Sequence, residues 1–130
     1  MNYLASPEFC RKLKELGVPQ NTLYYYCGKR IMDYSEIVHD KITDFMSAFS
    51  TDELLAMMPS YIKIGRYEAD LILQKDVDKY WVGYINTHEE IVTDTHSSND
   101  VPANALAKCL IHLLENKIID VKDLSVEVKP

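Results

Sequence analysis

The sequence predicts an α+β fold, in which an antiparallel β-meander sheet is covered by a long C-terminal helix and by shorter N-terminal and central helices. Three observations support this prediction. Apolar residues recur at helical spacing between Pro102 and Ile119, the period changes to two from Tyr61 onward, and two earlier segments begin with residues typical of helix starts. At 130 residues, 47% of them hydrophobic and 26% charged, the chain fits a single α+β domain over 1–130.

The N-terminal helix is predicted from its start and its end. Ser6-Pro7-Glu8 combines a residue that can cap a helix, a proline that suits the first turn and an acid that complements the helix dipole. Gly17 can adopt the left-handed conformation that ends many helices, and Pro19 prevents continuation. We therefore expect a short helix between these signals.

An aromatic run over Thr22–Cys27, TLYYYC, is predicted to be a strand, because aromatic side chains suit a pleated and half-covered surface. In a strand, Tyr24 and Tyr26 share one face and Tyr25 lies on the other. At least one of these tyrosines is therefore expected to be exposed unless both faces of the strand are covered.

The middle of the chain holds one ambiguous segment and one clear one. Asp33–Phe49 has apolar residues at helical spacing, yet its β-branched content and the lack of a clear helix start leave an extended or irregular segment open. After it, Ser50-Thr51-Asp52-Glu53 offers a capping oxygen and early acids, and Pro59 ends the pattern. The second segment predicts a short central helix.

Beyond the central helix, alternation predicts four short strands, SYIKI, ADLILQK, KYWVGYI and EIVTD, which short turns join into the meander. We expect consecutive strands to be antiparallel, with hairpin turns at Lys75–Lys79 and Asn86–Glu89. Trp81 is expected on one face of the sheet, and Val82 and Tyr84 on the other.

The long helix is predicted over Pro102–Ile119, PANALAKCLIHLLENKII, where the leucines share one face. The polar residues gather on the opposite face, which we expect to be solvated: Asn104, Lys108, His112 and Glu115. The tail after this helix has an alternating apolar pattern and either adds an edge strand or frays. Its apolar residues are Leu124, Val126 and Val128.

The formal net charge of −6 argues against nucleic acid as a partner, because 14 basic residues are outnumbered by 20 acidic ones. One local set of basic residues is the exception: Arg11, Lys12 and Lys14, with Lys29 and Arg30 further along. A solvated helix face is a simpler interpretation of this set than a phosphate-binding patch.

The expected compartment is the cytoplasm. The N-terminus, MNYLASPEF, lacks the basic and apolar regions of a secretory signal, and no apolar run reaches membrane-spanning length. Cys10, Cys27 and Cys109 are odd in number and far apart, so we expect free thiols rather than disulfides.

A metal site or a small enzyme centred on four residues is one alternative. Cys109 and His112 lie three apart on the predicted helix, and His88 and His96 lie in the loops before it. Against this alternative, the chain has no C-x-x-C pair, and His112 falls on the polar arc while Cys109 falls on the apolar one. We expect no metal or cofactor, because a buried free cysteine is ordinary core material, and no glycine-rich phosphate loop is present.

Tyrosine is the better indication of a surface role. Nine tyrosines accompany three phenylalanines and one tryptophan, and tyrosine is frequent at protein interfaces because its ring is apolar and its hydroxyl tolerates water. The alternative is that these rings pack against the long helix. We expect a protein partner or self-association and infer no small-molecule ligand. The candidate contact residues are Tyr24, Tyr26, Trp81 and Tyr84.

Two stretches also resemble a known group of proteins. A W-x-x-Y strand at Trp81 to Tyr84 precedes a Pro-Ala helix start and an A-L-x-x-x-L-I-x-L-x-E-N helix from Ala105 to Asn116, and STDELLAMMP lies upstream. The chain thereby resembles small uncharacterised proteins of bacterial prophages and related mobile elements. The resemblance implies a sandwich of helices and sheet, and it implies no catalytic residues.

These observations favour a non-enzymatic accessory protein of a prophage or mobile element that acts by protein-protein contact. A further alternative is an acidic mimic of nucleic acid that inhibits a host factor, which fits the sign of the charge. Such a mimic needs carboxylates arrayed on one surface, whereas Asp and Glu are dispersed among lysines in this sequence.

Overall fold

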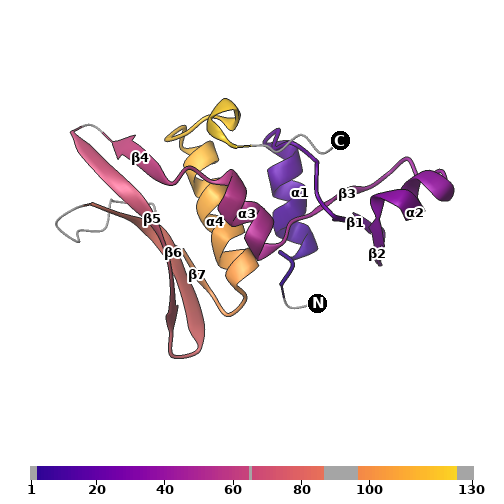
Figure 1. Ribbon diagram of the computed structural model, residues 1–130, viewed down its shortest axis with the longest axis horizontal. Helices are drawn as coiled ribbons and strands as arrows, with labels where there is room; N and C mark the ends of the chain where they lie inside the picture. Colours follow the sequence, from indigo (N-terminus) through magenta and orange to yellow (C-terminus); the bar gives the residue numbers. More distant parts are fainter. Residues whose placement is uncertain (1–2, 65, 87–96, 126–130) are drawn as a thin grey trace.

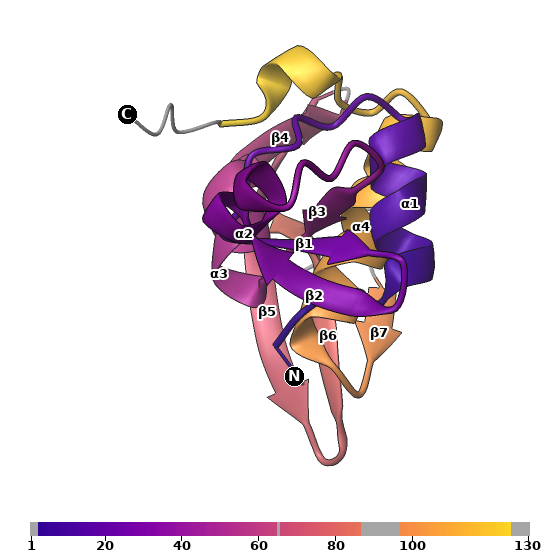
Figure 2. The same ribbon diagram turned by 90° about the vertical axis from the view of Figure 1, so that its right-hand side faces the viewer.

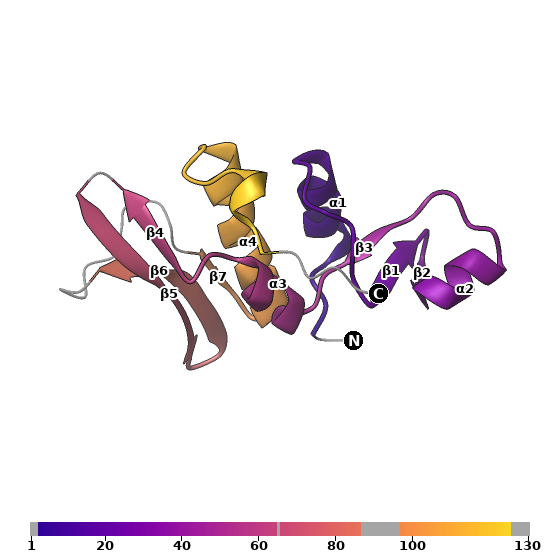
Figure 3. The same cartoon turned by 45° about the horizontal axis from the view of Figure 1, so that its top comes forward.

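The computed structural model describes residues 3–64, 66–86 and 97–125, and it confirms the α+β class. A four-stranded sheet lies on one side, α1, α3 and α4 lie in the middle, and a three-stranded sheet with α2 lies on the other side (Figures 1 and 3). The elements in chain order are α1 (Pro7–Glu15), β1 (Tyr24–Cys27), β2 (Arg30–Asp33), α2 (Tyr34–His39), β3 (Met46–Ala48), α3 (Thr51–Met57), β4 (Tyr61–Ile64), β5 (Tyr67–Asp76), β6 (Lys79–Asn86), β7 (Ser97–Asn99), α4 (Pro102–Glu115) and the 3-10 turn η1 (Val121–Asp123).

Helix α1 begins and ends at the predicted signals. Pro7 occupies its first turn. At the other end Gly17 has a φ of +88°, and the Val18 amide donates to the Leu13 carbonyl at 3.0 Å. This bond and the left-handed glycine form a Schellman ending, which glycine adopts without the strain that a Cβ would cause.

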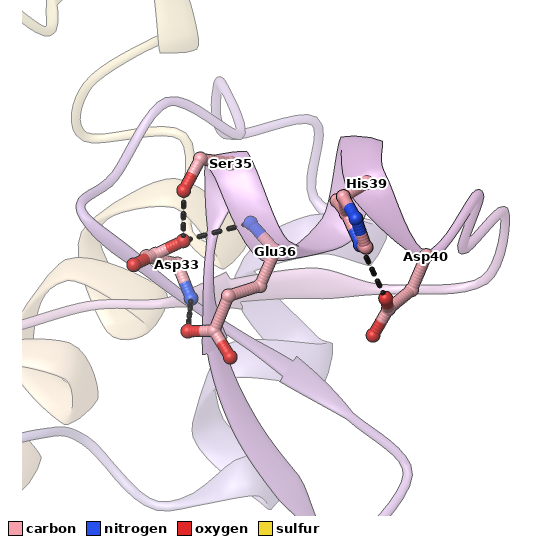
Figure 4. Close-up of polar contacts among 5 residues, drawn as sticks. All are labelled: Asp33, Ser35, Glu36, His39 and Asp40. Atoms are coloured by element: carbon pink, nitrogen blue, oxygen red, sulfur yellow. Dashed lines mark hydrogen bonds and ion pairs between the residues drawn. The ribbon is translucent and has the colours of Figure 1, made fainter.

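The ambiguous segment 33–49 contains both a helix and a strand. The Glu36 amide donates to Asp33 Oδ1 at 2.8 Å, and the Asp33 amide donates to Glu36 Oε1 at 3.3 Å (Figure 4). This reciprocal capping box starts α2, and the chain later extends into β3. Each interpretation of the segment therefore applies to one part of it, and the D-x-x-E start was the signal that sequence reasoning missed.

Helix α3 confirms the predicted central helix. The Glu53 amide donates to Ser50 Oγ at 3.1 Å, and the Ser50 amide donates to Glu53 Oε1 at 3.0 Å. Glu53 also accepts a hydrogen bond from the Leu23 amide at 2.9 Å. The carboxylate that caps α3 therefore also holds the residue just before β1.

The four-stranded sheet, with order β4-β5-β6-β7, is antiparallel throughout. Its tightest connection pairs Asp76 with Lys79, within the turn predicted at 75–79. The predicted meander is confirmed in part, because the fourth strand of the observed sheet is β7, which was not among the predicted strands. The predicted strand EIVTD and the turn residues 87–89 lie outside the described residues.

A second sheet, with order β2-β1-β3, was not predicted beyond its central strand. β1 and β2 are joined by the two-residue turn Gly28-Lys29, where Gly28 has a φ of +61°. A positive φ at the first turn residue is typical of a type II′ hairpin. β3 joins from further along the chain, with Tyr24 opposite Ala48. Strands this short show no alternation of apolar and polar residues, and no local sequence pattern predicts that two distant segments will pair.

Helix α4 lies at the centre of the main core. It contacts β6 and β7 on one side and α1 and α3 on the others (Figure 3). Its buried residues are Ala103, Ala105, Leu106, Ala107, Cys109, Leu110, Ile111, Leu113 and Leu114. The helix ends at Glu115, before the predicted end at Ile119.

The polar face of α4 is not solvated as the sequence led us to expect. The Ser6 amide donates to Asn104 Oδ1 at 2.7 Å, and Lys12 Nζ lies 3.1 Å from Glu115 Oε2. Helix α1 therefore covers this face, and of its four polar residues only Glu115 is exposed. The amphipathic pattern of α4 does not indicate whether the polar face of another helix, here α1, packs against its own polar face.

The end of the described chain folds back onto α3. Leu124 is buried, and the Ser125 amide donates to the Met57 carbonyl at 2.9 Å. The predicted edge strand or frayed tail at 124–128 lies mostly outside the described residues, including Val126 and Val128.

Candidate functional site

Tyr84, one of the four predicted contact residues, belongs to the core. Its side chain is 0% exposed, and its hydroxyl donates to the Pro59 carbonyl at 2.8 Å. Burial raises the pKa of the Tyr84 hydroxyl well above its ordinary value. The expectation that Tyr84 contributes to an exposed surface is wrong, because Tyr84 and Val82 both lie on the face of β6 that packs on α4.

Tyr24 and Tyr26 lie on one face of β1 and are half-buried. The Tyr26 hydroxyl donates to the Ala5 carbonyl at 2.6 Å, and burial raises the pKa of this hydroxyl to about 12. Tyr25, on the other face, is buried, and its ring meets Phe45 edge-on with centroids 5.3 Å apart. Both faces of β1 are therefore covered, and Tyr25 and Tyr26 contribute to packing.

Trp81 lies on the opposite face of the four-stranded sheet, as predicted, and is half-buried. The register places Asp70 between Tyr61 and Ile85, and it places Ile72 opposite Gly83. Since Gly83 has no side chain, the apolar side chains around it are neighbours on the same face. We call Tyr61, Ile72, Trp81 and Ile85 the outer-face residues.

The outer-face residues are only partly covered. Tyr61 is 55% exposed, and the other three are half-buried. Among the described residues, no helix lies on this side of the sheet (Figures 1 and 3). Charged residues border it, since Lys63 Nζ lies 3.6 Å from Glu68 Oε1, and both are exposed. An apolar centre with a polar border is the usual composition of a protein-contact surface.

The four residues of the metal-site alternative are not brought together within the described part of the chain. His88 and His96 lie outside the described residues. Cys109 is fully buried, and burial raises the pKa of its thiol to about 12. His112 is half-buried, with Nδ1 3.2 Å from Asn116 Nδ2. Within 3–64, 66–86 and 97–125, no group of three or more His, Cys, Asp or Glu side chains is placed to hold a metal ion.

The basic residues near the N-terminus are divided between two environments. Lys12 pairs with Glu115 on α4, whereas Arg11 and Lys14 line a pocket of about 250 Å³ between α1 and the second sheet. The pocket was not predicted, because its other lining residues come from β1, its turn, the segment before β3 and the first residue of β3. They are Tyr26, Gly28, Asp44, Phe45 and Met46.

Comparison with known proteins found no match, since no family model, no curated protein and no solved structure matches the chain. None of the helices in the described residues has the length and apolar character needed to cross a bilayer.

Proposed function

We propose that this protein is a non-enzymatic contact module that binds another protein, or a second copy of itself, through the outer face of its four-stranded sheet. The observation that carries this proposal is the alignment of Tyr61, Ile72, Trp81 and Ile85 on a sheet face that no described helix covers. Aromatic anchors at the centre of such a face commonly contribute much of the binding energy.

Several features support this surface over the tyrosines of β1. Trp81 stands opposite Gln74, and Asp70 separates Tyr61 from Ile85, so polar groups are interspersed within the patch. Polar groups of this kind give an interface its specificity, whereas the apolar rings supply buried area. Tyr26, by contrast, already uses its hydroxyl within the fold.

The resemblance of the second half of the chain to small prophage and mobile-element proteins supports an accessory role in a bacterial cytoplasm. The metal-binding or enzymatic alternative around His88, His96, Cys109 and His112 gains no support from the buried thiol of Cys109. The proposal of a nucleic-acid mimic also gains no support. The first thirty residues hold five of the 14 basic residues and only two of the 20 acidic ones, so this part of the chain is basic rather than acidic.

Site-specific photo-crosslinking in a bacterial host tests the contact function. A photoreactive phenylalanine derivative replaces Tyr61 in one variant and Tyr34 in the matched control, because the two tyrosines are similarly exposed, at 55% and 59%, while Tyr61 lies on β4 and Tyr34 lies on α2 beside the smaller sheet. We expect adducts of defined mass from position 61 that are missing from position 34. Adding Trp81→Ser to the Tyr61 variant should abolish them.

Native mass spectrometry of the untagged protein complements this experiment, since one spectrum reports self-association and bound metal. Identical adducts from both positions, or adducts from position 61 that survive Trp81→Ser, would contradict the proposal. Added mass that a chelator removes would favour the metal-binding alternative instead.

A further inference from the structure

Basic residues are concentrated at one place in an otherwise acidic protein. Arg11 and Lys14 lie one turn apart on α1, so both side chains project from the same side of the helix. The β1–β2 turn brings Gly28 to this side, where it lines the same pocket as the two cations. The positive charge of the pocket therefore comes from α1, and its other walls come from the smaller sheet and the segment before β3.

The pocket has fixed walls. Lys14 Nζ donates to the Phe45 carbonyl at 2.9 Å, which holds the ammonium group at the pocket while leaving it further donors. Tyr26 is held by its bond to Ala5. A Cβ at Gly28 would meet no atom within 4 Å, so the space in front of the turn is open. The volume of about 250 Å³ is below that of most drug-sized ligand sites, which restricts the occupant to a small molecule.

The two cations of the pocket have no carboxylate partner within 4.0 Å in the described part of the chain, whereas Lys12, between them in the sequence, is paired with Glu115 at 3.1 Å. A guanidinium presents donors in a planar fork that matches the oxygens of a phosphoryl group, and an ammonium adds a compact positive charge. Asp44, the one acid of the pocket, is an acceptor for a hydroxyl.

We infer that this pocket binds a small phosphomonoester, with its phosphoryl oxygens on Arg11 and Lys14 and its ester group against Tyr26 and Met46. The inference goes beyond the contact function, since the pocket lies between α1 and the three-stranded sheet. This sheet lies on the opposite side of α4 from the four-stranded sheet (Figures 1 and 3). The protein as a whole has a net charge of −6 and therefore repels anions. A pocket lined by two cations is for this reason a distinctive feature of the molecule.

The test is titration of ¹⁵N-labelled full-length protein with phenyl phosphate at constant ionic strength, followed by amide chemical shifts. We expect saturable shifts for Gly28, Lys29 and Asp44. Arg11→Gln and Lys14→Gln should each weaken binding by roughly fivefold to tenfold, because each removes a charged hydrogen bond at a partly exposed site. Lys12→Gln is the matched control, since it removes the same charge from the same helix but outside the pocket, and it should change the affinity less than about twofold.

Asp44→Asn provides a test with the opposite sign, because it removes the negative charge of the pocket, and it should tighten binding severalfold. The inference is overturned if phenyl phosphate causes no saturable shifts at Gly28, or if Lys12→Gln weakens binding as much as Lys14→Gln. Equal affinity for inorganic phosphate would overturn the placement of the ester group against Tyr26 and Met46.

Discussion

The two sheets of this protein contain similar residues but differ in how many of their faces are covered. The three-stranded sheet has α2 over Tyr25 and Met32 on one face, and α1 near Tyr26 and Met46 on the other (Figure 2). The four-stranded sheet packs Val82 and Tyr84 on α4, while its opposite face carries Tyr61 and Trp81 without a described helix.

The comparison shows that coverage, rather than residue type, decides whether a strand tyrosine is core or surface. Tyr25 and Tyr84 are buried, although they lie on different sheets, and Tyr61 is 55% exposed. A sheet with both faces covered has only its edges and the pockets at its margins for binding. A sheet with one open face has a broad surface, and for this reason we assign the contact function to the larger sheet.

The largest expected effect comes from α4, which supports the larger sheet directly and the smaller one through α1. Leu110 is fully buried, so Leu110→Ala should lower the free energy of unfolding by about 3 kcal/mol. Urea denaturation followed by far-UV circular dichroism and by the fluorescence of Trp81, the single tryptophan, measures this loss. Because both sheets depend on α4, the two signals should change together. Separate transitions would show that the sheets unfold independently.

Thiol reactivity distinguishes the main core, which contains Cys10 and Cys109, from the margin of the smaller sheet, which contains Cys27. Burial raises the pKa of Cys10 to about 11 and that of Cys109 to about 12, so little thiolate forms at pH 8. Cys27, at the end of β1, is only half-buried. With Ellman's reagent we expect Cys27 to react at least about a hundredfold faster than the other two. Cys27→Ser is the control, and fast labelling that persists in it would contradict the assigned burial.

The same chemical change on two tyrosines of the larger sheet compares its two faces. Tyr84→Phe removes the fully buried side chain's hydrogen bond to the Pro59 carbonyl and should lower the free energy of unfolding by about 1 to 2 kcal/mol. Tyr61→Phe, on the exposed face, should change it by less than about 0.5 kcal/mol. Urea denaturation of both variants measures the difference. Equal losses would mean that the outer face is covered in the folded protein.

The smallest effects concern the hairpin turns of the two sheets. Both have a positive φ at the first turn residue, +61° at Gly28 and +31° at Val77, but only the first is a glycine. Val77 is 93% exposed, so Val77→Gly should relieve backbone strain and raise the free energy of unfolding by about 1 kcal/mol. Gly28→Ala should lower it by a similar amount. Thermal denaturation measures both, and a loss of stability in Val77→Gly would refute the assigned turn geometry.

Several elements were predictable because their signals are local. The start of α3 at Ser50 and Glu53, the end of α1 at Gly17 and the hairpin within 75–79 depend on residues that are neighbours in the chain. Helix α2 was equally local, since Asp33 and Glu36 form the same kind of capping box as Ser50 and Glu53. The sequence left a helix and an extended segment both open, because the apolar pattern that continues to Phe49 runs through a six-residue helix and then a strand.

The candidate sites were predictable only in part. The alternation of β6 placed Trp81 and Tyr84 on opposite faces, so only one of them was able to lie on an open surface, but it did not indicate which face α4 covers. The pocket at Arg11 and Lys14 depends on residues from α1, the β1–β2 turn and the segment before β3. No spacing in the sequence relates these segments to one another.

The sequence by itself determined the α+β class, the start of α3, the ends of α1 and, for the strands that it predicted, the side on which a residue lies. These follow from hydrogen bonds and steric limits between residues close in the chain. Only the tertiary structure decided that α1 covers the polar face of α4, that β3 pairs with β1 and that the outer face of β5 and β6 has no described helix over it. Packing between distant segments depends on the shape and burial of the whole chain, and a local pattern carries too little information to specify it.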